Sequence, residues 1–197
     1  MTAHNHAASS DEKQEDTLPV LFEVLGGDAL GGRKLFIGNR VAADNADLLL
    51  ANGITSTMNL AVNIELLPLA LADGSVVRRT HIGLIDGPGN LPQHVLGAVF
   101  VLHGILGQAS PGKMSYPPHR QGNVLVHCRG GRSRSAGVVA LYLHLVHGET
   151  FQSLDAALAH VRNARGLGPT HPLPDMVGLA RRIVMHRDAI APLFDAL

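Results

Sequence analysis

The chain has 197 residues, 46% of them hydrophobic, which predicts one globular domain long enough to bury a substantial core. Its 16 Lys and Arg residues balance 16 Asp and Glu residues, so the overall charge does not indicate a nucleic-acid or membrane-surface partner. The single cysteine excludes an intramolecular disulfide, and no apolar run reaches the roughly twenty residues that cross a bilayer. We therefore expect a cytoplasmic protein without a membrane span.

The N-terminal residues 1–17 are polar and charged, and they lack the apolar segment of a signal peptide. This composition predicts a disordered tail, followed by one folded domain over residues 18–197. A first strand is predicted at 18–25 and a second at 35–38. The glycines between these strands do not form a nucleotide-binding loop, because no Gly-Lys-Ser/Thr sequence follows them.

The next segment is predicted to contain a short helix and two strands. Asp44 is a candidate N-cap of the helix, which we expect to end at Gly53. Strands are predicted at 54–60 and within 76–84. Asp86 follows the second of these strands, in a loop rich in Gly, Pro and Asn. In an open α/β sheet, ligands bind at the edge formed by the carboxyl ends of parallel strands, and Asp86 is predicted at that edge.

Hydrophobic periodicity and turn residues predict the remaining elements. These are a helix at 91–106, a Pro- and Gly-rich loop at 107–121, a strand at 124–126, a helix from Ser135, a helix capped by Thr150, a loop at 166–174, and a final helix from Pro174 or Asp175. Together the elements predict an α/β fold with a central, mostly parallel sheet of four to five strands flanked by helices.

The most informative stretch runs from residue 123 to 145, NVLVHCRGGRSRSAGVVALYLHL. A buried strand passes through a glycine-containing loop into a helix, an order that points backbone N–H groups and the helix N-terminus at an anion. A thiol at Cys128 would become more acidic there, since cysteines in such surroundings have pKa values of roughly 3.5–7.5. The guanidinium of Arg134 can bind two oxygens of a tetrahedral anion.

A structural explanation of these residues is also available. A lone cysteine after a strand is usually a small buried hydrophobe, and Gly-Gly is usually a turn. Three arginines, however, follow Cys128 within six residues, where a buried strand passes into a helix. Charged residues are rarely buried without partners, so we favour the functional interpretation.

The motif His127-Cys128-x-x-Gly131-x-x-Arg134-Ser135 resembles the signature loop of the cysteine-dependent protein tyrosine phosphatases, and most closely the dual-specificity branch. The stretch LFIGNRVAADNADLLLANGITSTMNL is similar to the opening of such domains, and the segment 153–174 resembles their helix ending Val-Arg-x-x-Arg with its Pro-containing loop. One departure is Ala157, where many relatives carry tyrosine. The resemblance covers most of residues 34–190.

The resemblance implies a protein tyrosine phosphatase-like fold and a set of roles. Cys128 would form a phosphocysteine intermediate, and Asp86 would act as general acid and then base. His127 would orient the loop and lower the thiol pKa, while Ser135 would donate to the sulfur; alternatively, His127 ends a strand and Ser135 caps a helix. Asn59 would lie under the loop or bond a turn. The substrate-binding residues would be Arg129, Gly130, Gly131, Arg132, Ser133 and Arg134.

Some choices stay open at this level. Asp47 and Asp73 are alternative acids by residue type. Arg129 and Arg132 either favour highly charged substrates or face solvent with little effect.

The predicted function is hydrolysis of phosphotyrosine and phosphoserine/threonine in proteins, without metal or cofactor and without a nucleic-acid partner. The same loop could instead hydrolyse a lipid, nucleotide, RNA or sugar phosphate. A binding-only pseudophosphatase would not need the thiol, and a rhodanese-type sulfurtransferase is disfavoured by the Arg-Ser ending of the loop and the upstream aspartate.

Overall fold

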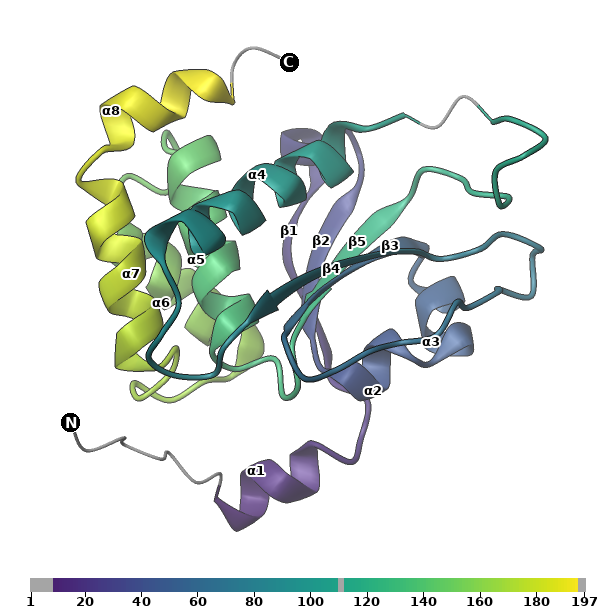
Figure 1. The fold of residues 1–197 in the computed structure, drawn as a ribbon, viewed down its shortest axis with the longest axis horizontal. Helices are drawn as coiled ribbons and strands as arrows, with labels where there is room; N and C mark the ends of the chain where they lie inside the picture. The colour runs from purple at the N-terminus through teal and green to yellow at the C-terminus, as the bar shows by residue number, and fades with distance from the viewer. Residues whose placement is uncertain (1–8, 110–111, 195–197) are drawn as a thin grey trace.

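The computed structural model describes residues 9–109 and 112–194 (Figure 1). Its centre is a five-stranded sheet in the order β1-β2-β5-β3-β4. The strands are β1 (Leu21–Gly26), β2 (Lys34–Gly38), β3 (Ile54–Ala61), β4 (Arg78–Leu84) and β5 (Asn123–His127). Only β1 and β2 pair antiparallel, and the other neighbouring strands are parallel. The predicted mostly parallel sheet is therefore confirmed.

Helices cover both faces of this sheet (Figure 1). One face carries α4 (Pro92–Gly107), α5 (Arg134–Val146), α6 (Leu154–Arg165) and α7 (Pro174–Val184), and the other carries α2 (Arg40–Ala43) and α3 (Ala46–Ala51). The central strand β5 shows how side chains alternate between the faces. Val124 and Val126 join the larger apolar cluster under α5, while Leu125 joins the smaller cluster under α3. Every residue of β3 is buried, as expected of a strand covered on both faces.

Helix α5 occupies the middle of the larger layer, where it contacts α4, α6 and α7. All its residues from Arg134 to Leu145 are buried, which explains why its sequence is apolar on nearly every side. Short helical segments complete the fold: η1 (Gly27–Leu30), α8 (Arg187–Ile190) and η2 (Ala191–Leu193). Within residues 9–109 and 112–194, each helix is too short or too polar to span a bilayer.

Two predicted helix starts are wrong by one and three residues. Helix α3 is capped by Asn45, whose Oδ1 accepts from the Leu48 backbone N–H at 2.9 Å, because the carboxylate of Asp44 instead pairs with Arg79 at 3.2 Å. Helix α6 is capped by Ser153 rather than by Thr150. The end of α3 is as predicted, with Gly53 in the left-handed conformation (φ 61°).

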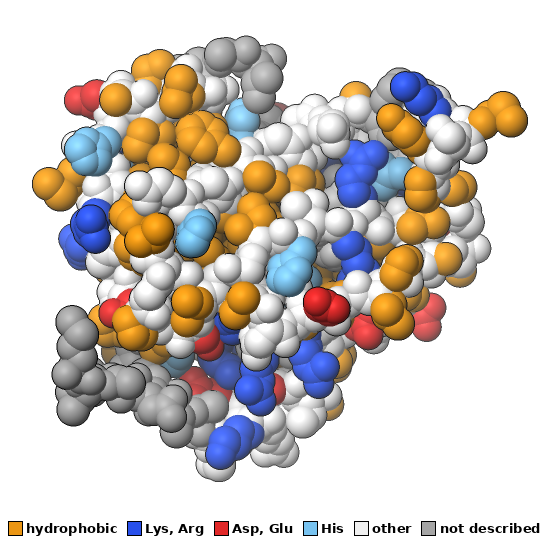
Figure 2. All heavy atoms as spheres, in the orientation of Figure 1, with side chains coloured by type: hydrophobic (Ala, Val, Ile, Leu, Met, Phe, Trp, Pro, Cys, Tyr) orange, Lys and Arg blue, Asp and Glu red, His pale blue; other side chains and the backbone are white. Residues whose placement is uncertain are grey.

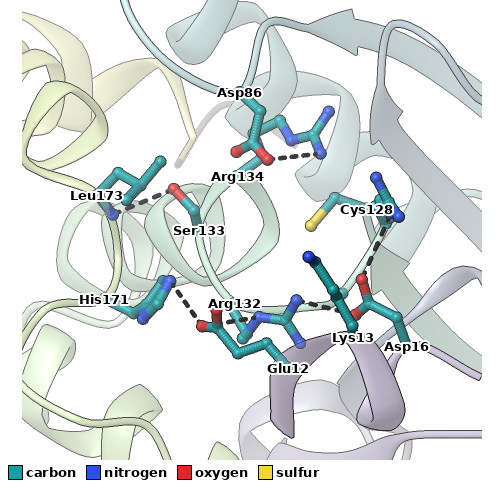
Figure 3. Close-up of a pocket in the computed structure, with 12 residues that line it drawn as sticks. Glu12, Lys13, Asp16, Asp86, Cys128, Arg132, Ser133, Arg134, His171 and Leu173 are labelled. Carbon is teal, nitrogen blue, oxygen red and sulfur yellow. Dashed lines mark hydrogen bonds and ion pairs between the residues drawn. The ribbon is translucent and has the colours of Figure 1, made fainter. Parts of the chain in front are cut away.

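The N-terminal segment differs from the expected disordered tail. Residues Ser10–Glu15 form helix α1, which begins with a capping box. The Ser9 hydroxyl accepts from the Glu12 N–H at 3.2 Å, and the Glu12 carboxylate accepts from the Ser9 N–H at 2.9 Å. Helix α1 buries no residue of its own, and lies beside the loop that follows β5 (Figures 1 and 3). Residues 1–8 of the expected tail lie outside the described residues.

Candidate active site

The loop between β5 and α5 lies at the carboxyl edge of the parallel strands. Its conformation depends on Gly131, which has φ of 72° and lies against β2. A Cβ at this position would be 2.5 Å from the Gly38 carbonyl oxygen, so no side chain fits. The Arg129 carbonyl accepts from the Arg40 N–H at 3.1 Å, and the Gly130 carbonyl accepts from Arg165 at 3.2 Å. The loop is thus fixed by β2, α2 and α6.

This loop forms one wall of a cavity of about 320 Å³ (Figure 3). Cys128, Arg134 and Asp86 all line it, although they come from two separate loops and a helix start. The other lining residues are Glu12, Lys13, Asp16, Arg129, Gly130, Arg132, Ser133, His171 and Leu173. The cavity therefore brings together the three residues that the sequence predicts to act in one site. It also includes residues from an N-terminal helix that the sequence does not predict.

The Cys128 thiol is 2% exposed and lies 3.4 Å from the Ser135 hydroxyl oxygen. Burial alone would raise the pKa of this thiol, and Asp86 also acts to raise it. The positive charge of Arg134 and the hydrogen bonds from the Ser135 side chain and backbone outweigh both, so the pKa of Cys128 is lowered from its ordinary value. The site therefore favours the thiolate, which is the nucleophilic form.

The guanidinium of Arg134 is 3% exposed and is held between the two loops at the carboxyl edge of the sheet. It donates to the Leu84 carbonyl at 3.3 Å and to the Asp86 carboxylate at 3.2 Å. The Asp86 side chain is 51% exposed, and the side chain of Asn90 closes its loop by bonding both backbone groups of Ile85. The Asp86 carboxyl therefore lines the cavity from a loop that Asn90 holds in place, and the carboxyl remains partly exposed to solvent.

His127 lies under the loop and is fully buried. Its Nδ1 donates to the Cys128 carbonyl oxygen at 3.3 Å. Burial, which outweighs this hydrogen bond, lowers the pKa of His127 to about 4. The ring is therefore neutral near pH 7 and carries no positive charge to lower the thiol pKa. Its hydrogen bond joins the ring to the backbone of the loop at Cys128.

The two additional arginines of the loop are placed differently from each other. The Arg129 side chain is 61% exposed and lies 3.4 Å from Asp16. The Arg132 side chain is only 12% exposed and pairs with Glu12 at 3.4 Å, with Glu15 at 2.8 Å and with Asp16 at 2.8 Å. Arg132 thus turns toward helix α1 and away from solvent, while it still lines the cavity.

No protein-family model matches the chain. Among curated proteins, mouse dual specificity phosphatase 28 is 33% identical over 132 residues, which are 66% of this chain and 69% of that protein. The chain belongs to the dual-specificity phosphatase family. Mouse dual specificity protein phosphatase 26 is 31% identical over 151 residues, which are 76% of this chain. The chain spans 65% of the length of that relative.

Solved structures of dual-specificity phosphatases share the fold. A single-residue variant of human DUSP28 superposes with a TM-score of 0.63 at 23% identity, covering 87% of this chain and 99% of that one. A mouse putative dual specificity phosphatase, solved with zinc tungstate, also gives a TM-score of 0.63 at 23% identity and covers 94% and 97% of the two chains.

The alternative residues that the sequence offers, Asp47, Asp73 and Asn59, do not line the cavity. Asp47 is in α3, and Asp73 bonds Ser75 and Arg120, contacts that lower the pKa of its exposed carboxyl to about 2. The Asn59 amide bonds the turn after β3, donating to the Ile64 carbonyl at 2.5 Å, which matches the turn-bonding alternative.

Several cavity residues were not predicted. Composition predicts a disordered tail at Glu12, Lys13 and Asp16, although the Ser9-x-x-Glu12 capping box is a signal for a helix start. His171 comes from the loop between α6 and α7, and no local pattern marks it. Within the described parts of the chain, no group of three or more His, Cys, Asp or Glu side chains is placed to hold a metal ion.

Proposed function

We propose that this protein is a phosphatase that hydrolyses phosphate monoesters through a phosphocysteine intermediate. The observation that carries the proposal is the convergence of Cys128, Arg134 and Asp86 on one cavity, with the Ser135 hydroxyl 3.4 Å from the sulfur. These residues supply a nucleophile, a dianion-binding group and a proton donor, the three functions that monoester hydrolysis requires.

In the first step, the thiolate of Cys128 attacks phosphorus and the bond from phosphorus to the ester oxygen breaks. Asp86, in its protonated form, transfers a proton to that oxygen, so an alcohol or phenol leaves. The Asp86 carboxyl lines the same cavity and lies 3.2 Å from Arg134, so it is close to the group that would hold the phosphate. The products of this step are the phosphocysteine and the Asp86 carboxylate.

Charge on the transferring phosphoryl group needs donors around it. Within the described residues, the backbone N–H groups of residues 129–133 make no hydrogen bond to a protein acceptor, which leaves them available for phosphate oxygens. The guanidinium of Arg134 adds a planar pair of N–H donors at the start of α5. This arrangement stabilises charge where it develops in the transition state.

In the second step, the Asp86 carboxylate accepts a proton from water, which attacks phosphorus and releases inorganic phosphate. The sulfur leaves as a thiolate, and the Ser135 hydroxyl donates to it. The enzyme returns to its starting state, with the proton back on Asp86.

We propose phosphorylated proteins as the substrates, on the basis of the names of the relatives. Since a thiolate nucleophile works only while it is reduced, the cytoplasm, where thiols are kept reduced, is the compartment that fits this chemistry.

The test is an assay of the protein against matched phosphotyrosine, phosphoserine and phosphothreonine peptides, a phosphoinositide and a nucleotide. The Cys128→Ser variant serves as the blank, since its hydroxyl stays protonated at neutral pH. We expect peptide turnover by the wild type and none by the variant. Turnover confined to the lipid or the nucleotide would contradict the protein substrate, and equal turnover by both proteins would contradict the mechanism.

A further inference from the structure

Helix α1 places a concentration of negative charge against the arginines of the loop. Residues 11–16 carry four carboxylates and one lysine. Three of these carboxylates, those of Glu12, Glu15 and Asp16, lie within 3.4 Å of Arg132. Figure 3 shows Glu12 and Asp16 approaching Arg132 across the side of the cavity opposite Asp86 and Arg134. Figure 2 shows basic and acidic side chains gathered at the lower edge of the molecule, where helix α1 lies in Figure 1.

The carboxylates around Arg132 favour its charged form, and their negative charges offset its positive charge. Burial acts to lower the pKa of its guanidinium, but the carboxylates, Asp16 foremost, raise the pKa above its ordinary value. Asp16 also lies 3.4 Å from Arg129, and Glu15 pairs with Arg165 at 2.9 Å. Each loop arginine other than Arg134 therefore faces a carboxylate from the N-terminal segment.

Arg134 is in a different position. Its partner Asp86 must carry a proton in the first step of the proposed mechanism, and a protonated carboxyl no longer competes with phosphate for the guanidinium. The carboxylates of Glu12, Glu15 and Asp16 have no such role in the proposed mechanism. A second phosphate on the substrate, placed near Arg129 or Arg132, would have to displace these carboxylates or lie beside them.

We propose that Glu12, Glu15 and Asp16 determine specificity by screening Arg129 and Arg132, so that the cavity accepts esters with one phosphate group and rejects polyanionic phosphates. This inference rests on the proposed function and deepens it by naming the charge class of the substrate. It assigns the two additional arginines to the docking of α1 rather than to substrate binding.

The test compares the affinity of the intact chain for inositol hexakisphosphate with its affinity for orthophosphate, both measured by calorimetry. The variant carries Glu12→Gln, Glu15→Gln and Asp16→Asn. Glutamine is also accepted in a capping box, so the start of α1 is retained. We expect the ratio of the two affinities to shift about tenfold toward the polyanion, a change that corresponds to about 1.4 kcal/mol.

The matched control is Asp11→Asn, which removes a carboxylate from the same helix. The Asp11 carboxylate accepts a hydrogen bond from the Ser10 hydroxyl at 3.2 Å, and Asp11 does not line the cavity. We expect this variant to keep the wild-type ratio. A shift equal to that of the triple variant would show a general effect of net charge and would overturn the proposal.

Adding Arg132→Gln to the triple variant separates the screening of this arginine from other effects. We expect most of the gain in polyanion affinity to disappear. A gain that persists without Arg132, or an unchanged ratio in the triple variant itself, would overturn the proposal. Because binding is measured without turnover, a failure of the proposed hydrolysis would be seen separately, as normal binding shifts in a protein that cleaves no ester.

Discussion

The wall of the cavity that holds Cys128 is fixed by the core, whereas the wall formed by α1 is fixed by ion pairs. Strand β5 and helix α5, on either side of the loop, contribute an almost unbroken run of buried residues. Helix α1 buries none, and its contacts to the loop are charged. The two walls therefore depend on different interactions.

The two kinds of interaction suit the two walls to different functions. Burying one aliphatic side chain contributes roughly 1.5–3 kcal/mol, while a partly exposed ion pair contributes about 0–1 kcal/mol and weakens with salt. The core wall can hold the sulfur, Arg134 and the loop N–H groups in the positions that catalysis needs. The α1 wall can set which substrates reach them, and it can change without loss of the fold.

The largest effect is expected on the chemical side, from Asp86→Asn. Loss of the proton donor should lower kcat by roughly 10²–10⁴-fold, and more for alkyl than for aryl phosphates, because the alkyl leaving group needs the proton more. Steady-state assays on p-nitrophenyl phosphate and a phosphothreonine peptide measure this. Asp73→Asn is the control and should match the wild type; a wild-type rate for Asp86→Asn would assign the acid to another residue.

Gly131→Ala should disrupt the packing of the Cys128 loop against β2. Gly131 and Gly166 share φ of 72°, but a Cβ at Gly131 would be 2.5 Å from the Gly38 carbonyl, while a Cβ at Gly166 would meet no atom within 4 Å. Both alanines are strained by the backbone angle, and only Gly131→Ala adds the clash, for an additional loss of about 2–3 kcal/mol. Denaturant unfolding measures both. Equal losses would show that the loop has room to move.

A smaller change should follow from Ser135→Ala, which removes one of the groups that lower the pKa of Cys128. With a higher thiol pKa, less thiolate is present at low pH, so the acidic limb of the kcat/KM profile should move to higher pH. At a pH on that limb, we expect a loss of about tenfold, which one pKa unit gives. The pH dependence of iodoacetamide alkylation measures the thiol directly. An unmoved limb would show that Arg134 alone sets the thiol pKa.

The smallest effect concerns the α1 wall. High ionic strength should screen its ion pairs and increase hydrogen exchange in α1 severalfold, with β5 and α5 unchanged. Exchange followed by mass spectrometry at low and high salt measures this. Equal protection of α1 at both salt concentrations would show that contacts other than charge hold it.

The sequence predicted best what depends on neighbours along the chain. The strand, the loop and the helix around Cys128 are one continuous segment, and the central strands of the sheet follow from short apolar runs. The positions of Cys128 and Arg134 in the cavity, with the Ser135 hydroxyl beside the sulfur, follow from the same local geometry. The position of Asp86 was also predicted, because this residue follows the end of a parallel strand and therefore lies at the carboxyl edge of the sheet.

What the sequence did not reveal depends on distant partners. The polar composition of residues 1–17 hides the fact that Glu15 meets Arg132, 117 positions away. The composition of a segment indicates how much apolar surface it can bury. Helix α1 buries no residue and is held by charged contacts, which composition does not reveal. The cap of α3 was misplaced for a similar reason, since Asp44 is drawn to Arg79, a residue on β4.

The most direct test of the account is to trap the intermediate on Cys128. The wild-type protein is mixed with p-nitrophenyl phosphate, quenched within the first turnover and analysed by peptide mass spectrometry. We expect one phosphoryl group on the Cys128 peptide, present in the wild type and missing in Cys128→Ser. Steady turnover with no phosphate on Cys128, or with phosphate on another residue, would contradict it.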